Sequence, residues 1–159
     1  MLLHLFSALV ALSTLALIFA GGLVTSTGSG LAVPDWPNTY GWFMFAFPLE
    51  KMVGGIFYEH GHRLIASTVG ILTVILVIWL WRSETRSWVR RLSYIALATV
   101  VTQGILGGIT VLWFLPAPIS ISHAGLAQIF FCLTITITLV TSRGWKDAYR
   151  GSVEAKTSI

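Results

Sequence analysis

The chain has 159 residues, the length of one domain, of which 55% are hydrophobic and only 10% are charged. Its mean hydropathy of +0.82 excludes an ordinary soluble domain, because such a domain needs more charge to cover its surface, whereas lipid suits this composition. The single cysteine, Cys132, excludes an internal disulfide and a zinc site of several cysteines.

Charged residues divide the chain into apolar segments. None occurs in residues 1–34, 64–81 or 92–142. The last segment is too long for one membrane span of roughly 20 residues. Pro116 and Pro118 interrupt it, because proline removes a helix donor and clashes with the preceding turn. The sequence therefore predicts an all-α, integral membrane four-helix bundle in one domain, residues 1–159, with helices at about 3–26, 56–81, 92–114 and 119–142.

The basic residues predict the orientation of the bundle. Eight of the ten lie in two places, the connection between the second and third helices and the tail at 143–159. The positive-inside rule puts both segments, and both termini, in the cytoplasm. The net charge of +4 is thus a topology signal and requires no nucleic-acid partner. No Lys or Arg precedes the first helix, so it lacks the start of a signal peptide and we expect it to be retained. The eight residues are Arg82, Arg86, Arg90, Arg91, Arg143, Lys146, Arg150 and Lys156.

The loop after the first helix, residues 27–54, is expected to face the outside. It contains the run Pro34-Asp35-Trp36-Pro37 and then becomes strongly aromatic. A loop of this length and apolar character predicts either a lid over the mouth of the bundle or an interfacial loop without a ligand. The aromatic residues are Tyr40, Trp42, Phe43, Phe45 and Phe47.

Ionisable side chains gather at the outer end of the second helix and recur near the start of the fourth. Such groups are unfavourable inside a span unless they face a cavity or a partner, so each is a candidate site residue. The two helices run in the same direction, which puts His62 and His123 at similar depth. Glu59 and His62 share a helix face. His60 lies about 200° around the helix from His62, and we expect it at the membrane surface.

Two inward histidines at one depth can bind a planar macrocycle from both sides, as cofactor sites in bundle cores do. The sequence therefore favours a haem, with His62 and His123 as ligands of its iron. A zinc or copper site would need further ligands, and only Glu59 is near. A proton path in a transporter and a purely structural role stay open. Arg63 could pair with a haem propionate or extend to the surface.

The third helix contributes small residues to the predicted site. Gln103, Gly107 and Gly108 lie along it, and Gly21 and Gly22 end the first helix. Glycine lets a backbone approach a flat ring closely, although it serves ordinary helix packing equally well. We include Gln103, Gly107 and Gly108 among the candidate cofactor-binding residues.

Four segments, in order on the predicted helices, carry a family resemblance. They are residues 22–37, the Glu-x-x-His-Arg motif at 59–63, residues 103–111 and His123. Together they resemble the haem A synthases of cytochrome oxidase assembly. The resemblance covers most of the chain, and its strength lies in the order of the four pieces.

This resemblance implies a membrane oxidoreductase that oxidises a methyl group of haem O to the formyl group of haem A by successive hydroxylations. It implies that His62 and His123 hold the haem and that Glu59 acts at the methyl carbon. A carboxylate there could stabilise an electron-deficient carbon or take a proton from attacking water. The resemblance further implies a multi-pass protein of a prokaryotic-type inner membrane. Candidate partners are the enzyme that makes haem O and the subunits of cytochrome c oxidase.

The chain departs from the family pattern in two respects. Most members have eight helices in two halves, the second holding a haem b, and this chain matches one half. We expect it either to pair with itself as a homo-oligomer or to lack the electron-delivery role of that haem. A cysteine pair in the outer loop of many members is replaced by Val33 and Thr39. Two alternatives remain, a haem carrier and a haem b electron-transfer protein, and neither needs Glu59.

Overall fold

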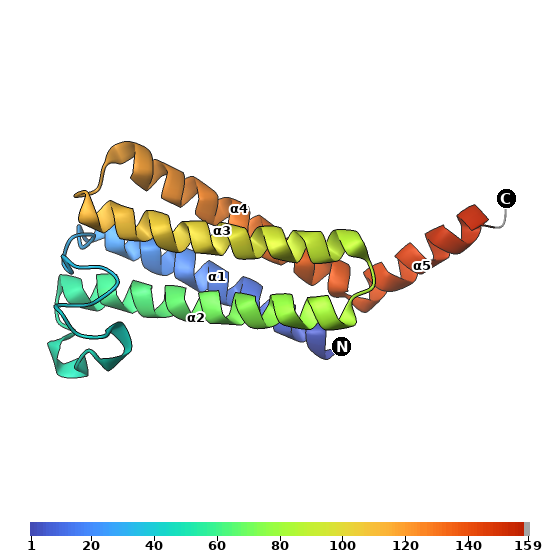
Figure 1. Ribbon diagram of the computed structural model, residues 1–159, viewed down its shortest axis with the longest axis horizontal. Helices are drawn as coiled ribbons and strands as arrows, with labels where there is room; N and C mark the ends of the chain where they lie inside the picture. Colours follow the sequence, from blue (N-terminus) through green and yellow to red (C-terminus); the bar gives the residue numbers. More distant parts are fainter. Residues whose placement is uncertain (158–159) are drawn as a thin grey trace.

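The computed structural model describes residues 1–157 and consists of an antiparallel bundle of four long helices (Figure 1). Each is long and apolar enough to cross a membrane. This confirms the predicted fold class, an all-α membrane bundle. The helices are α1 (Leu2–Ser26), α2 (Gly55–Ser83), α3 (Ser87–Leu112) and α4 (Ala117–Thr141).

The connections give the bundle two different ends. One end, here called the loop end, carries residues 27–54, with two short 3₁₀ turns at Met44–Ala46 and Leu49–Lys51. The opposite end, the tail end, carries the N-terminus and the start of a fifth helix (Figure 1). Around the bundle, α1 and α3 each pack against both α2 and α4.

The fifth helix, α5 (Arg143–Thr157), was not expected. The sequence predicted only a tail at 143–159, of which residues 158–159 lie outside the described part. The structure starts a new helix at Ser142, whose hydroxyl accepts the backbone amide of Trp145 at 3.3 Å. A serine in this position satisfies an amide that the helix itself leaves free. In Figure 1, α5 points away from the bundle.

The apolar core lies toward the tail end. It combines Val10 of α1 with side chains from the middle and the tail-end halves of α2, α3 and α4. Large apolar side chains also cover the outer surface of the long helices, as expected for contact with lipid. Buried threonines donate their hydroxyls to carbonyls of the preceding turn, which satisfies them without water. The other core residues are Val69, Leu76, Leu80, Val89, Ala96, Phe130, Ile137 and Val140.

An ion pair closes the tail end between α2 and α3. The guanidinium of Arg86 donates to both carboxylate oxygens of Glu84, at 2.9 and 2.8 Å, and to the carbonyl of Val140 at 2.9 Å. One half-buried cation thereby joins the α2–α3 connection to α4. These hydrogen bonds from Arg86 hold the pKa of the Glu84 carboxyl below its ordinary value.

Glu84→Gln should lower the unfolding free energy of the protein in detergent by about 2 kcal/mol near neutral pH, because a charge-assisted hydrogen bond is lost. The folded pKa of Glu84 is lowered, so its contribution is complete above the unfolded pKa and disappears as the pH falls through the folded value. Thermal unfolding followed by circular dichroism at pH 7 and pH 3 measures both effects. The exposed Glu50→Gln variant is the control, and an equal loss in both variants would contradict the prediction.

Candidate functional site

The predicted site residues gather at the loop end, where the bundle is polar. His62 of α2 and His123 of α4 both face the interior, and they lie close enough for the charge of one ring to act on the other. The two histidines that the sequence put at one depth therefore both lie near the loop end, on helices that share the neighbours α1 and α3. The apolar core lies toward the other end of the bundle and includes none of these residues.

Each histidine ring packs against a glycine of a neighbouring helix. A Cβ atom at Gly21 of α1 would lie 3.1 Å from Cε1 of His62, and one at Gly107 of α3 would lie 3.4 Å from Cε1 of His123. In addition, Gln103 of α3 donates its side-chain amide to the backbone carbonyl of His123 at 2.8 Å. Three residues singled out on α1 and α3 thus fix the surroundings of the two imidazoles.

The imidazoles have unused hydrogen-bonding capacity. Nδ1 of His62 and Nδ1 of His123 are buried and have no partner in hydrogen-bond geometry, although the backbone of Leu17 lies near the His62 ring. Buried polar atoms are nearly always partnered in proteins, so two such atoms in one interior indicate a missing ligand. Among the described residues, no three His, Cys, Asp or Glu side chains form a group that could hold a metal ion. Two histidines alone fit a haem, whose ring supplies the other four iron ligands.

Glu59 is buried on α2, three residues before His62, and both of its carboxylate oxygens are engaged. Oε1 accepts a hydrogen bond from Nη2 of Arg63 at 2.6 Å, one helical turn further along α2. Oε2 accepts the backbone amide of Val33 at 2.7 Å. The carboxylate is therefore held in one position, between its own helix and the 27–54 loop.

The guanidinium of Arg63 is directed at the loop. Nη1 donates to the carbonyls of Asp35 and Asn38, at 2.7 and 3.0 Å, and Nη2 donates to the carbonyl of Val33 at 2.9 Å. With Glu59 these contacts give the buried cation four acceptors. The structure thus places Arg63 beneath the loop, and its pairing with a haem propionate stays a prediction.

The expectation that His60 lies at the membrane surface is wrong. Its ring is 1% exposed, because the loop folds over the end of α2. Nδ1 of His60 lies 3.0 Å from the hydroxyl of Thr39, and the ring packs against Phe47 with 4.9 Å between centroids. Thr39 and Val33, the two positions matched with family cysteines, are both fully buried here.

Asp35 closes the loop on itself, a role that the sequence analysis missed. Its carboxylate accepts the backbone amides of Tyr40 and Gly41, each at 2.8 Å. Burial alone would raise the pKa of this carboxyl, but the two amide donors together with the Arg63 charge outweigh it, and the pKa lies below its ordinary value. An aspartate directly after a proline in a loop is a turn-forming signal that could have indicated this contact.

The loop also reaches across to α3. The indole of Trp36 lies flat against Gly108, where a Cβ atom would come within 2.6 Å of Cδ2 of the indole. Gly108 therefore serves contact with the loop, and its neighbour Gly107 serves contact with His123. The two glycines predicted together on α3 have separate structural roles.

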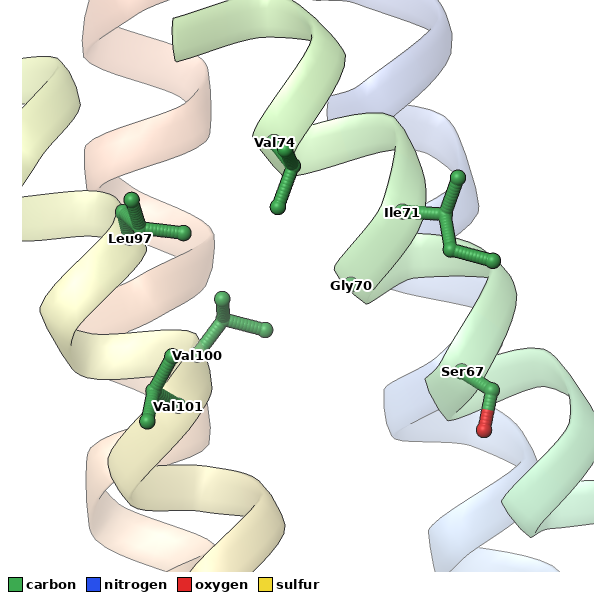
Figure 2. Close-up of a pocket in the computed structure, with 7 residues that line it drawn as sticks. All are labelled: Ser67, Gly70, Ile71, Val74, Leu97, Val100 and Val101. Carbon is green, nitrogen blue, oxygen red and sulfur yellow. The ribbon is translucent and has the colours of Figure 1, made fainter.

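A groove between α2 and α3 lies apart from these residues. It has a volume of about 310 Å³ and is lined by apolar side chains, together with Ser67 and Gly70. In Figure 2, Val74 of α2 and Leu97 and Val100 of α3 point into it. None of the predicted site residues is in its lining, so this groove is separate from the candidate site.

The fold and the histidine pair define a class of protein, a membrane-embedded helical bundle with a two-histidine site that fits a haem. A model of the cytochrome oxidase assembly protein family matches residues 43–157, and the chain belongs to this family.

Curated relatives agree with this family. The chain is 32% identical over 136 residues to the haem A synthase of Bacillus licheniformis, covering 81% of this chain and 43% of that protein. It is 30% identical over 141 residues to the haem A synthase of Geobacillus kaustophilus, covering 85% and 42% respectively. For that of Exiguobacterium sibiricum the identity is 28% over 156 residues, 96% of this chain and 51% of the relative. The chain spans about half the length of these relatives. No solved structure matches it.

Gly21→Ala should weaken haem binding about tenfold, because the added methyl group would press on the His62 ring. Gly22→Ala is a matched control, since nothing lies within 4 Å of a Cβ atom at that position. Titration of each purified variant with haem b, followed by absorption, gives the affinities. Equal affinities for the two variants would show that the contact between Gly21 and His62 does not shape the site.

Proposed function

We propose that this chain binds haem O between His62 and His123 and oxidises a methyl group of that haem to the formyl group of haem A. The observation that carries the proposal is the pair of buried, unpartnered imidazole nitrogens on α2 and α4, with the Glu59 carboxylate nearby on α2. Membership of the cytochrome oxidase assembly protein family supports it. The haem A so formed would serve cytochrome c oxidase.

The proposed roles follow from the positions of the side chains. His62 and His123 hold the iron, and Gly21 and Gly107 leave room for their rings. The bound haem supplies the methyl carbon that is oxidised. Glu59 provides a fixed negative charge, or accepts a proton from attacking water, near that carbon. Its hydrogen bonds to Arg63 and Val33 hold it in place for either role.

The proposed setting is a prokaryotic-type inner membrane. The basic residues at the tail end would face the cytoplasm, which puts the loop end and the histidines at the outer side. We also propose that the chain acts as a homo-oligomer. Oxidation of the methyl group by water releases electrons and protons, and the electrons would pass to a one-electron acceptor held by the partner copy, with haem b as the candidate.

A haem carrier is the second candidate function, and one observation favours it. Both oxygens of Glu59 are already bonded, so a structural role for this residue is chemically sufficient. A carrier would pass its haem to the oxidase unchanged. The two functions differ in whether the haem that leaves the protein has the same substituents as the haem that entered.

His62→Ala and His123→Ala should each abolish the low-spin, bis-histidine absorption spectrum of the haem-loaded protein, because a single imidazole leaves one axial position open. His4→Ala is the control, since His4 lies on α1 at the tail end, where it contacts the Thr138 carbonyl at 2.9 Å. A parental protein that stays colourless when produced with abundant haem would refute the haem site itself.

Glu59→Ala should lower conversion of haem O by about 100-fold or more, the usual contribution of a positioned acid or base, while haem stays bound. Glu59→Gln removes the charge and one of the two acceptors, because its amide oxygen can still accept from Arg63 while its NH2 group then faces the Val33 amide. Extraction of the bound haem and its chromatography against haem O, A and B measures the outcome. Conversion at the parental rate by Glu59→Ala would exclude a catalytic role for Glu59, whereas a parental protein that binds haem O and releases it unconverted would exclude the enzyme and leave the carrier.

A further inference from the structure

We propose that Trp36 forms a wall of the haem site and closes it at the loop end, between α2 and α3. The inference rests on the proposed binding of haem by His62 and His123. It assigns to the 27–54 loop a direct contact with the ligand, made by an indole that the structure holds in place from both sides.

On one side, the position of the indole is set by the buried guanidinium of Arg63. Arg63 binds the carbonyls of Val33, Asp35 and Asn38, which lie on either side of Trp36 along the chain. A backbone held at three carbonyls by one guanidinium has little conformational freedom. Because that guanidinium belongs to α2, this helix sets the direction in which the Trp36 side chain points. The Asp35 carboxylate adds to this by closing the following turn.

On the other side, the indole is held by contact with α3. The face of the indole lies directly on Gly108, closer than any side chain there would allow. The preceding residue on the same helix, Gly107, lies against the His123 ring. Adjacent residues on an α-helix differ by about 100° in direction and by about 1.5 Å in height, so the indole and this imidazole are at the same depth.

A macrocycle bound by His123 would lie beside Gly107, one residue along α3 from the glycine that the Trp36 indole covers. The indole is 41% exposed although its position is fixed, which leaves part of its surface available for contact. Aromatic side chains readily pack against flat conjugated rings, and a fixed one loses little freedom in doing so. Trp36 would thus exclude water from the outer edge of the haem and slow its escape.

The test measures how fast ferric haem b leaves the purified full chain for an excess of apomyoglobin. Trp36→Ala should accelerate release about fivefold or more, whereas Trp36→Phe, which keeps an aromatic ring, should change it much less. The bis-histidine spectrum should be unchanged in both, since neither iron ligand is altered. Gly108→Ala should accelerate release as well, because the new methyl group displaces the indole.

Trp42→Ala is the matched control. Trp42 belongs to the same loop and is similarly exposed, at 45%, but its ring lies under the Lys51 ammonium and is not among the atoms that meet Gly108. It should release haem within about twofold of the parental rate. The double variant Trp36→Ala/Gly108→Ala should release haem no faster than Trp36→Ala alone, because the glycine acts through the indole.

Two results separate failure of this inference from failure of the proposed function. If the parental protein shows no bis-histidine spectrum, the proposed haem site and the proposed role of Trp36 are both wrong. A parental protein with that spectrum, in which Trp36→Ala releases haem at the parental rate, overturns the role of Trp36 alone. Equal acceleration by Trp36→Ala and Trp42→Ala overturns it too, since the effect would then come from the loop in general.

Discussion

The structure of the loop end depends on one constraint: the buried guanidinium of Arg63 must find hydrogen-bond acceptors. A guanidinium inside a membrane helix is highly unfavourable unless it is fully bonded. Arg63 satisfies this requirement with the Glu59 carboxylate and with three carbonyls of the 27–54 loop. The loop must therefore pass over the end of α2 along one path. This path explains which loop residues are buried. It also explains why the Val33 amide reaches Glu59 and why the Trp36 indole reaches α3.

Most of the bundle could be predicted, because its signals are local to the sequence. Stretches without charge marked the four long helices, and the direction of α2 and α4 placed His62 and His123 near each other. The start of α5 was missed although Ser142 offers an ordinary helix-capping signal. A basic tail after the last span was sufficient to explain orientation, so its own helical character was not considered.

The loop could not be predicted, because its contacts are made largely by the backbone. Three of the acceptors of Arg63 are carbonyl groups, which every residue carries and no sequence pattern marks. Helical periodicity correctly directed His60 away from His62. It could not show that the loop would cover that side of α2 and bury the ring. Similarly, the glycines of α3 could be read as packing residues, but not assigned to His123 and Trp36 separately.

The apolar core and the histidine pair occupy different halves of the bundle. Nine apolar core side chains, from Val10 to Val140, set the register of the four helices toward the tail end, and none of them is a candidate site residue. The energy that assembles the helices is therefore largely independent of whatever the histidines bind. Under the proposed function, a newly inserted chain would complete its fold before it binds a macrocycle, so membrane insertion and haem supply would not need to be synchronised.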